Sequence, residues 1–84
     1  MDAYRTLGQA LFYVGEKGEA IRQLRLAVAC RPERYENHMV LGEYLAEVGE
    51  KDEAVQVLTT AEQLAPPGDP RPRELIDRLR GPKK

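Results

Sequence analysis

The strongest constraint on this chain is an internal repeat with a period of 34 residues. Residues 1–34 aligned without a gap on residues 35–68 share twelve identities. The shared residues of the first copy are Leu7, Gly8, Leu11, Val14, Gly15, Glu16, Lys17, Glu19, Ala20, Leu24, Ala27 and Pro32. A fixed period of this length indicates a supersecondary unit stacked on a copy of itself, so that neighbouring units bury one continuous core. The pattern favours a binding surface as the function and does not identify what binds.

The spacing of apolar residues predicts two helices in each repeat. Tyr4, Leu7 and Leu11 recur at intervals of three and four, which places them on one stripe of a helix. Gly15 follows that stripe, where a left-handed residue commonly ends a helix, and Pro32 ends the second helix. The expected helices cover residues 2–14, 18–31, 36–48, 52–64 and 70–80. Their core stripes are Tyr4, Leu7, Leu11 and Val14; Ala20, Leu24, Ala27 and Val28; His38, Leu41, Leu45 and Val48; and Ala54, Val55, Leu58 and Ala61.

The residues after the second repeat copy the beginning of a third. Leu75 and Leu79 lie one further period beyond Leu41 and Leu45, and Asp69 is placed to cap a last helix. We expect this helix to cover the final apolar surface and to expose a polar face of Arg71, Arg73, Asp77, Arg78 and Arg80. The sequence thus predicts one all-α domain with repeat 1 at 1–34, repeat 2 at 35–68, a capping helix at 69–81 and a disordered tail at 82–84.

Composition and charge exclude several classes of function. The net charge of −1 gives no general attraction to nucleic acid or to an anionic membrane. A single cysteine excludes an internal disulfide. No apolar run is long enough to cross a membrane, and the N-terminus does not resemble a signal peptide, so we expect a cytoplasmic protein without nucleic-acid or membrane partners. Residues 66–84 are basic and residues 1–65 acidic, which suits contact with a partner or a solvated terminal helix.

No group of residues is suited to catalysis or to holding a cofactor or metal. His38 is the only histidine and falls on a core stripe, where a packed ring is expected. Cys30 takes the place of Leu64 in the second repeat and is expected to behave as a small apolar residue. Gly15 and Gly18 separate two helices, so they do not form a phosphate-binding loop after a strand. We therefore expect a protein that is not an enzyme and has no cofactors.

The repeated positions resemble the tetratricopeptide repeat. They are Tyr4, Leu7, Gly8, Leu11, Ala20, Leu24, Ala27 and Pro32, with their counterparts one period later. The chain departs from the family where His38 replaces an aromatic residue and where Leu11 and Leu24 replace large aromatic ones. The resemblance implies an all-α fold, a right-handed α-solenoid of two helix-turn-helix repeats plus a capping helix, with five helices in total.

The same resemblance implies that the first helix of each repeat lines a concave groove that binds a peptide or helix of a partner protein. The groove positions carried over are Asp2, Arg5, Gln9, Phe12 and Tyr13 in repeat 1, and Glu36, Met39, Glu43, Ala46 and Glu47 in repeat 2. Of these, Phe12, Tyr13 and Met39 are expected to be exposed, adaptable contacts. The three glutamates favour a basic or amphipathic partner, or else form a solvated helix face.

A carboxylate clamp found in this family is not matched. Arg5 fits its first position, but Val40 stands where an asparagine is needed, and Pro70 and Glu74 stand where basic residues are needed. Two alternatives to the peptide-binding module also remain. Two repeats are fewer than the three or so that such stacks normally need, so the alternatives are a self-associating homo-oligomer and a fragment of a longer array.

Overall fold

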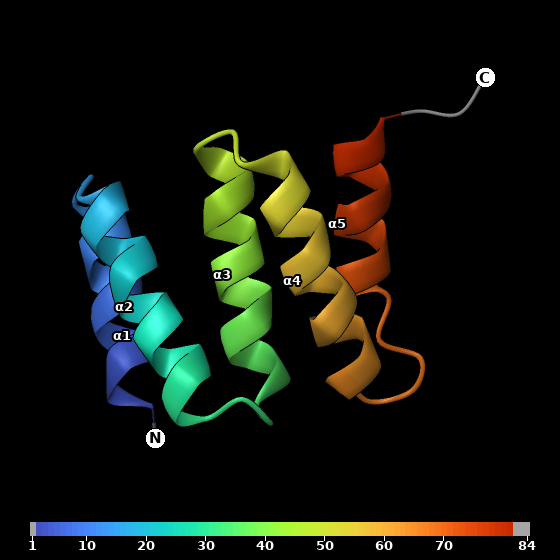
Figure 1. Ribbon diagram of the computed structural model, residues 1–84, viewed down its shortest axis with the longest axis horizontal. Coiled ribbons are helices and arrows are strands. Elements are labelled where there is room, and N and C mark those ends of the chain that lie inside the picture. The colour runs from blue at the N-terminus through green and yellow to red at the C-terminus, as the bar shows by residue number, and fades with distance from the viewer. Residues whose placement is uncertain (1, 82–84) are drawn as a thin grey trace.

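The computed structural model describes residues 2–81, and five α-helices follow one another along them (Figure 1). They are α1 (Ala3–Tyr13), α2 (Lys17–Cys30), α3 (Tyr35–Glu47), α4 (Lys51–Leu64) and α5 (Arg71–Arg80). Each helix was predicted from the sequence, and every bound falls within one residue of its prediction. Residues 82–84, predicted to be a disordered tail, lie outside the described part of the chain.

The helices pack mostly against their neighbours in sequence. The closest pairs are α1 with α2 and α3 with α4, and each pair is an antiparallel hairpin (Figure 1). The two hairpins join through α2 and α3, and α5 packs on α4. The first helices also touch one another, α1 with α3 and α3 with α5. The result is an all-α domain of about 39 × 26 × 16 Å in which the chain advances helix by helix.

The two hairpins turn in the same way because the same residues end their first helices. Gly15 and Gly49 have φ angles of +95° and +91°, a left-handed conformation that glycine adopts at little cost. After each glycine, the N–H of a glutamate donates to a carbonyl oxygen five residues earlier, Glu16 to Leu11 at 2.9 Å and Glu50 to Leu45 at 2.8 Å. This closing pattern satisfies carbonyl groups at the end of the helix. The repeated Val-Gly-Glu-Lys segment therefore fixes the same tight turn twice.

The start of α5 differs slightly from the prediction. The helix begins at Arg71, and Pro70 rather than Asp69 is the residue at its N-cap. Asp69 nevertheless satisfies the first free donor, because its Oδ1 accepts the Arg71 backbone N–H at 3.1 Å. Pro70 accepts the Glu74 N–H at 2.9 Å, the first helical bond of α5. Asp69 thus caps the helix although it lies one residue before the N-cap position.

The core lies between the second helix of one hairpin and the first helix of the next. Leu24 of α2 is packed in one cluster with Leu41 and Leu45 of α3, and a second cluster joins Leu58 of α4 to Ile76 of α5. His38 is buried as expected, and its Nε2 lies 2.9 Å from the Pro32 carbonyl oxygen. The predicted seams of α2, α3 and α4 are therefore buried or half-buried, with one exception: Val48 is 41% exposed, because it is the residue that ends α3.

The first stripe of repeat 1 is not buried as predicted. Tyr4, Leu7 and Val14 are 40%, 48% and 68% exposed. The matching side of α3 is covered by α2, whereas no helix among residues 2–81 lies on that side of α1. Cys30 is also exposed, because it sits in the last turn of α2 beyond the seam, and its counterpart Leu64 is 41% exposed at the end of α4.

Candidate functional site

The first helices α1, α3 and α5 share one face of the molecule and line two adjoining depressions on it. The depression nearer the start of α3 has a volume of about 350 Å³ and is lined by Arg5, Gln9, Tyr35, Glu36, Met39, Val40, Glu43 and Arg71. The depression nearer its end has a volume of about 480 Å³ and is lined by Phe12, Glu43, Tyr44, Ala46, Glu47, Leu75, Arg78 and Leu79. Glu43 belongs to both, so we treat them as one surface and name it the α3 groove.

The depression nearer the end of α3 has an aromatic wall. Phe12 of α1 stacks on Tyr44 of α3 with ring centroids 3.8 Å apart and planes only 2° from parallel. Leu75 and Leu79 of α5 form the opposite wall. Aromatic and aliphatic side chains in a concave site offer apolar area to a ligand, and the charged groups around them fix its orientation.

The depression nearer the start of α3 is polar, and hydrogen bonds hold its arginine side chains in place. An Arg71 Nη donates to the Tyr35 hydroxyl at 3.0 Å and to Asp69 Oδ2 at 2.9 Å, and the guanidinium lies 5.9 Å from the centre of the Tyr35 ring. On the other side, Arg5 donates to Asn37 Oδ1 at 3.0 Å. Both guanidinium groups are therefore held in place before any ligand arrives, which lowers the entropy cost of binding.

The electrostatics of the α3 groove centre on Glu43. Desolvation in the groove raises the pKa of the Glu43 carboxyl, and the positive charge of Arg71 partly opposes that shift. Desolvation, together with the nearby Glu43, also raises the pKa of Tyr44. A carboxylate that has lost part of its hydration gains more from a positively charged ligand than a fully solvated one does.

The residues carried over from the family resemblance fall into two groups. The structure brings most of them together in the α3 groove: Arg5, Gln9, Phe12, Glu36, Met39, Glu43, Ala46 and Glu47. Tyr13 is 92% exposed and lines neither depression. Met39 is only 6% exposed and packs with Leu58 and Ile76, so it forms the floor of the groove and part of the core rather than an exposed contact. Phe12 is half-buried by its stacking on Tyr44.

Asp2 also lies outside the groove, and its role is structural. It is buried, and its Oδ1 accepts the Arg5 backbone N–H at 3.1 Å, which caps α1. Burial by itself raises the pKa of Asp2, but the hydrogen bond from the Arg5 backbone, the nearby Asn37 amide and the positive charges of Arg5 and Arg31 outweigh it, so the net shift is downward. The cap is therefore charged at neutral pH, as suits the positive end of a helix.

Sequence reasoning missed the contribution of α5 to this face. Arg71 and Arg78 were predicted to belong to a polar outer surface, but both line the groove, as do Leu75 and Leu79. A signal was present in the repeat: Arg78 lies one period after Tyr44, which is itself a lining residue. The groove is therefore mixed in charge, with Arg5, Arg71 and Arg78 around the glutamates of α3.

Comparisons with known proteins do not add a family to this description. No family model matches the chain, and no curated protein matches it. Within residues 2–81 no helix is both long and apolar enough to cross a membrane. Across the same residues, no three His, Cys, Asp or Glu side chains gather as a metal site would need.

Proposed function

We propose that this chain is a protein-interaction module of the tetratricopeptide type, in which the α3 groove holds a peptide or a helix of a partner protein. The repeat of 34 residues, the matching turns at Gly15 and Gly49 and the stepwise packing of five helices support a right-handed solenoid of two repeats closed by α5. Such a stack places its first helices side by side on one surface, which is where partners bind.

The observation that carries the proposal is the lining of the α3 groove. Three helices contribute Phe12, Tyr44 and Leu75 as apolar walls, with charged groups of both signs beside them. Both depressions are open surfaces along α3 rather than enclosed cavities. A segment of polypeptide fits a surface of this kind, because it places apolar and charged side chains at intervals along its length.

The charged residues of the α3 groove indicate what kind of partner segment would bind there. Glu43 and Glu47 adjoin the apolar end of the groove, and Glu43 is partly desolvated. A lysine or arginine of the partner would pair with these carboxylates while its apolar neighbours contact Phe12 and Leu79. Arg71 and Arg78 on α5 repel a uniformly basic segment, so an amphipathic segment with a few basic residues is the better fit.

A peptide titration tests this proposal. Amphipathic peptides in basic and acidic versions of the same apolar pattern are titrated into the labelled protein at low and high salt. We expect the basic version to bind more tightly, to weaken as salt screens the charges and to strengthen as the pH rises past the raised pKa of Glu43. A preference for the acidic version would contradict the proposed partner chemistry.

Variants locate the binding on the α3 groove. Glu47→Lys reverses one exposed charge in the groove and is expected to weaken binding of the basic peptide by about tenfold, the equivalent of roughly 1.4 kcal/mol. Asp52→Lys makes the same change at an exposed site on α4 outside the groove and serves as the matched control. Equal effects of the two substitutions would show that only the overall charge matters and that the groove is not the site.

A further inference from the structure

The two repeats contain an internal comparison of covered and uncovered surfaces. Leu7 and Leu41 are the same residue at the same register, yet Leu7 is 48% exposed and Leu41 is 4% exposed. Tyr4 is likewise 40% exposed, whereas its counterpart His38 is buried. We name the outer side of the first hairpin, comprising Tyr4, Leu7, Leu11 and Glu19, the α1–α2 edge. It is the surface that in the second hairpin is buried under a helix.

Helix α2, which covers this surface in the second hairpin, shows what kind of helix fits such an edge. Ile21, Leu24, Ala27 and Val28 of α2 form the seam that buries Leu41 and Leu45 of α3. Beside this seam Arg25 forms a two-pronged ion pair with Glu53 of α4, and its Nη2 lies 3.1 Å from Oε1. The matching cover is therefore an amphipathic helix with an aliphatic seam and an arginine directly after its central leucine.

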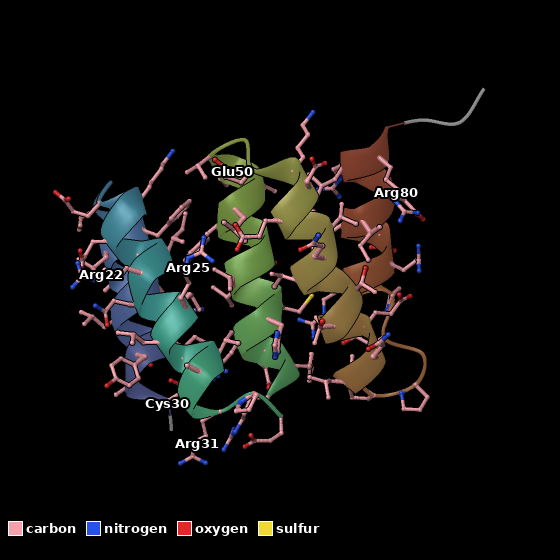
Figure 2. All side chains as sticks on the ribbon, viewed as in Figure 1. Arg22, Arg25, Cys30, Arg31, Glu50 and Arg80 are labelled. Atoms are coloured by element: carbon pink, nitrogen blue, oxygen red, sulfur yellow. The ribbon has the colours of Figure 1, made fainter. Side chains whose placement is uncertain are left out.

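The α1–α2 edge carries a counterpart of Glu53 as well as counterparts of the buried leucines of α3. Glu19 lies one period before Glu53, at the same place on the second helix of its hairpin. Within residues 2–81 its polar partners belong to its own helix, with Gln23 Nε2 at 3.2 Å and an Arg22 Nη at 3.9 Å. Figure 2 shows Arg25 directed from α2 toward α3 and α4, whereas Arg22 lies on the opposite side of α2 at the outer end of the molecule. The edge thus offers a carboxylate at the position where Glu53 receives an arginine.

We infer that the α1–α2 edge is a second docking surface, distinct from the α3 groove, and that it accepts one amphipathic helix of a partner carrying the seam and arginine pattern of α2. A second copy of this chain is a poorer fit, because neither of its equivalent helices is free. The seam of α2 is covered by α3, and that of α4 by α5 through Ile76, which is fully buried. The Arg73 guanidinium further holds α5 to Glu62 of α4 through two hydrogen bonds of 3.0 and 2.8 Å.

A helical peptide provides the probe. It reproduces residues 17–31 with Cys30→Ser, and a hydrocarbon staple on the face away from the seam stabilises the helix, since so short a helix is marginal alone. The peptide is titrated into the full chain while backbone amide signals are followed by NMR. We expect saturable binding with shifts confined to α1 and the first turns of α2. Shifts centred on the α3 groove, or no binding, would overturn the inference.

Matched variants separate the edge from the rest of the molecule. Leu7→Lys is expected to weaken peptide binding by about tenfold or more, whereas Tyr13→Lys, on an exposed site of the same helix, leaves it unchanged. An Arg25→Glu peptide binds the natural chain more weakly and regains affinity for the Glu19→Arg protein, as the proposed charge pair requires. Loss without this rescue overturns the pairing.

Sedimentation without peptide identifies the alternative occupant. We expect the chain to stay monomeric over the concentration range in which it binds the peptide. A dimer that Leu7→Lys dissociates would show that the occupant of the edge is a second copy, and would overturn the inference as stated. Because the expected shifts and the variant effects lie on the α1–α2 edge and not on the α3 groove, failure here leaves the proposed function to its own test.

Discussion

Two glycines mark the places where the paired helices come closest. A Cβ atom at Gly42 would lie 2.5 Å from Leu58 Cγ and 2.6 Å from Cδ2 of the same side chain. A Cβ atom at Gly8 would overlap Leu24 and lie 3.1 Å from the Ala20 carbonyl oxygen. A helix-interior glycine costs roughly 1 kcal/mol relative to alanine. Its use at the same register in both repeats indicates that the closer packing of the two helices offsets this cost.

We predict that Gly42→Ala destabilises the protein despite its better helix propensity. Leu58 is fully buried, and the new Cβ would lie within 2.6 Å of two of its atoms, so overpacking of about 1–3 kcal/mol is expected to outweigh the gain in propensity. Chemical denaturation with urea measures the difference. Gly18→Ala is the matched control, because a Cβ atom there meets nothing within 4 Å, and it is expected to be neutral or slightly stabilising. Equal effects of the two substitutions would contradict the close approach.

The repeat predicted these glycines, but it gave no signal for Asn37. Asn37 is fully buried, donates to the Ala27 carbonyl oxygen at 3.1 Å and accepts from Arg5 at 3.0 Å. Its counterpart one period earlier is Ala3, an exposed residue, so the alignment of the repeats contains no matching polar residue. The role of Asn37 depends on the junction between the hairpins, which occurs once in the chain, and periodicity detects only what occurs twice.

At the scale of elements, the sequence predicted the bounds of the helices well. It predicted the directions of their long side chains less well. Leu75 and Leu79 predicted that α5 covers the last apolar surface, and both pack against the cluster that Ile76 forms with Leu58 of α4. The same helix was given an outer face of arginines on the assumption that charged side chains turn to water. Arg71 and Arg78 instead line the groove, which is compatible with their charge because a long arginine side chain can lie beside apolar surface and still keep its guanidinium in water.

The ion pair between α2 and α4 makes the junction of the two hairpins sensitive to acid. The hydrogen bond from Arg25 lowers the pKa of Glu53 from its ordinary value of 4.5, so the folded protein holds the proton less readily than the unfolded chain. This contribution to stability is present above the ordinary pKa and is lost as the pH falls through the lowered value. Because both side chains are more than one-third exposed, its size is at most about 1 kcal/mol.

We predict that Glu53→Gln lowers stability at pH 7 and that the difference from the natural chain is smaller at pH 3, because the contribution of the ion pair is lost as the pH falls through the lowered pKa of Glu53. Urea denaturation at the two pH values makes the comparison, and Glu33→Gln, at an exposed loop residue, is the control. A difference that persists unchanged in acid would mean that the carboxylate is not its source.

At the scale of the whole molecule, stability should be graded along the stack. Each helix pair is supported by its neighbours: within residues 2–81 the inner hairpin α3–α4 is covered on both sides by α2 and α5, whereas α1–α2 is covered on one. The sequence predicted the stack itself, because identical stripes imply identical helices. It did not predict that the first stripe would be half-exposed, since burial depends on what lies beyond the stripe and not on the stripe alone.

Leucine-to-alanine substitution at one register measures that gradient directly. Leu41→Ala removes a buried side chain from the joined core and is expected to cost about 2–5 kcal/mol. Leu7→Ala makes the same chemical change where nearly half of the side chain is already in water, and is expected to cost about half as much or less. Urea denaturation of dilute protein supplies both values. If the two costs are equal, Leu7 is as well covered in solution as Leu41, and the α1–α2 edge is not free to receive a helix.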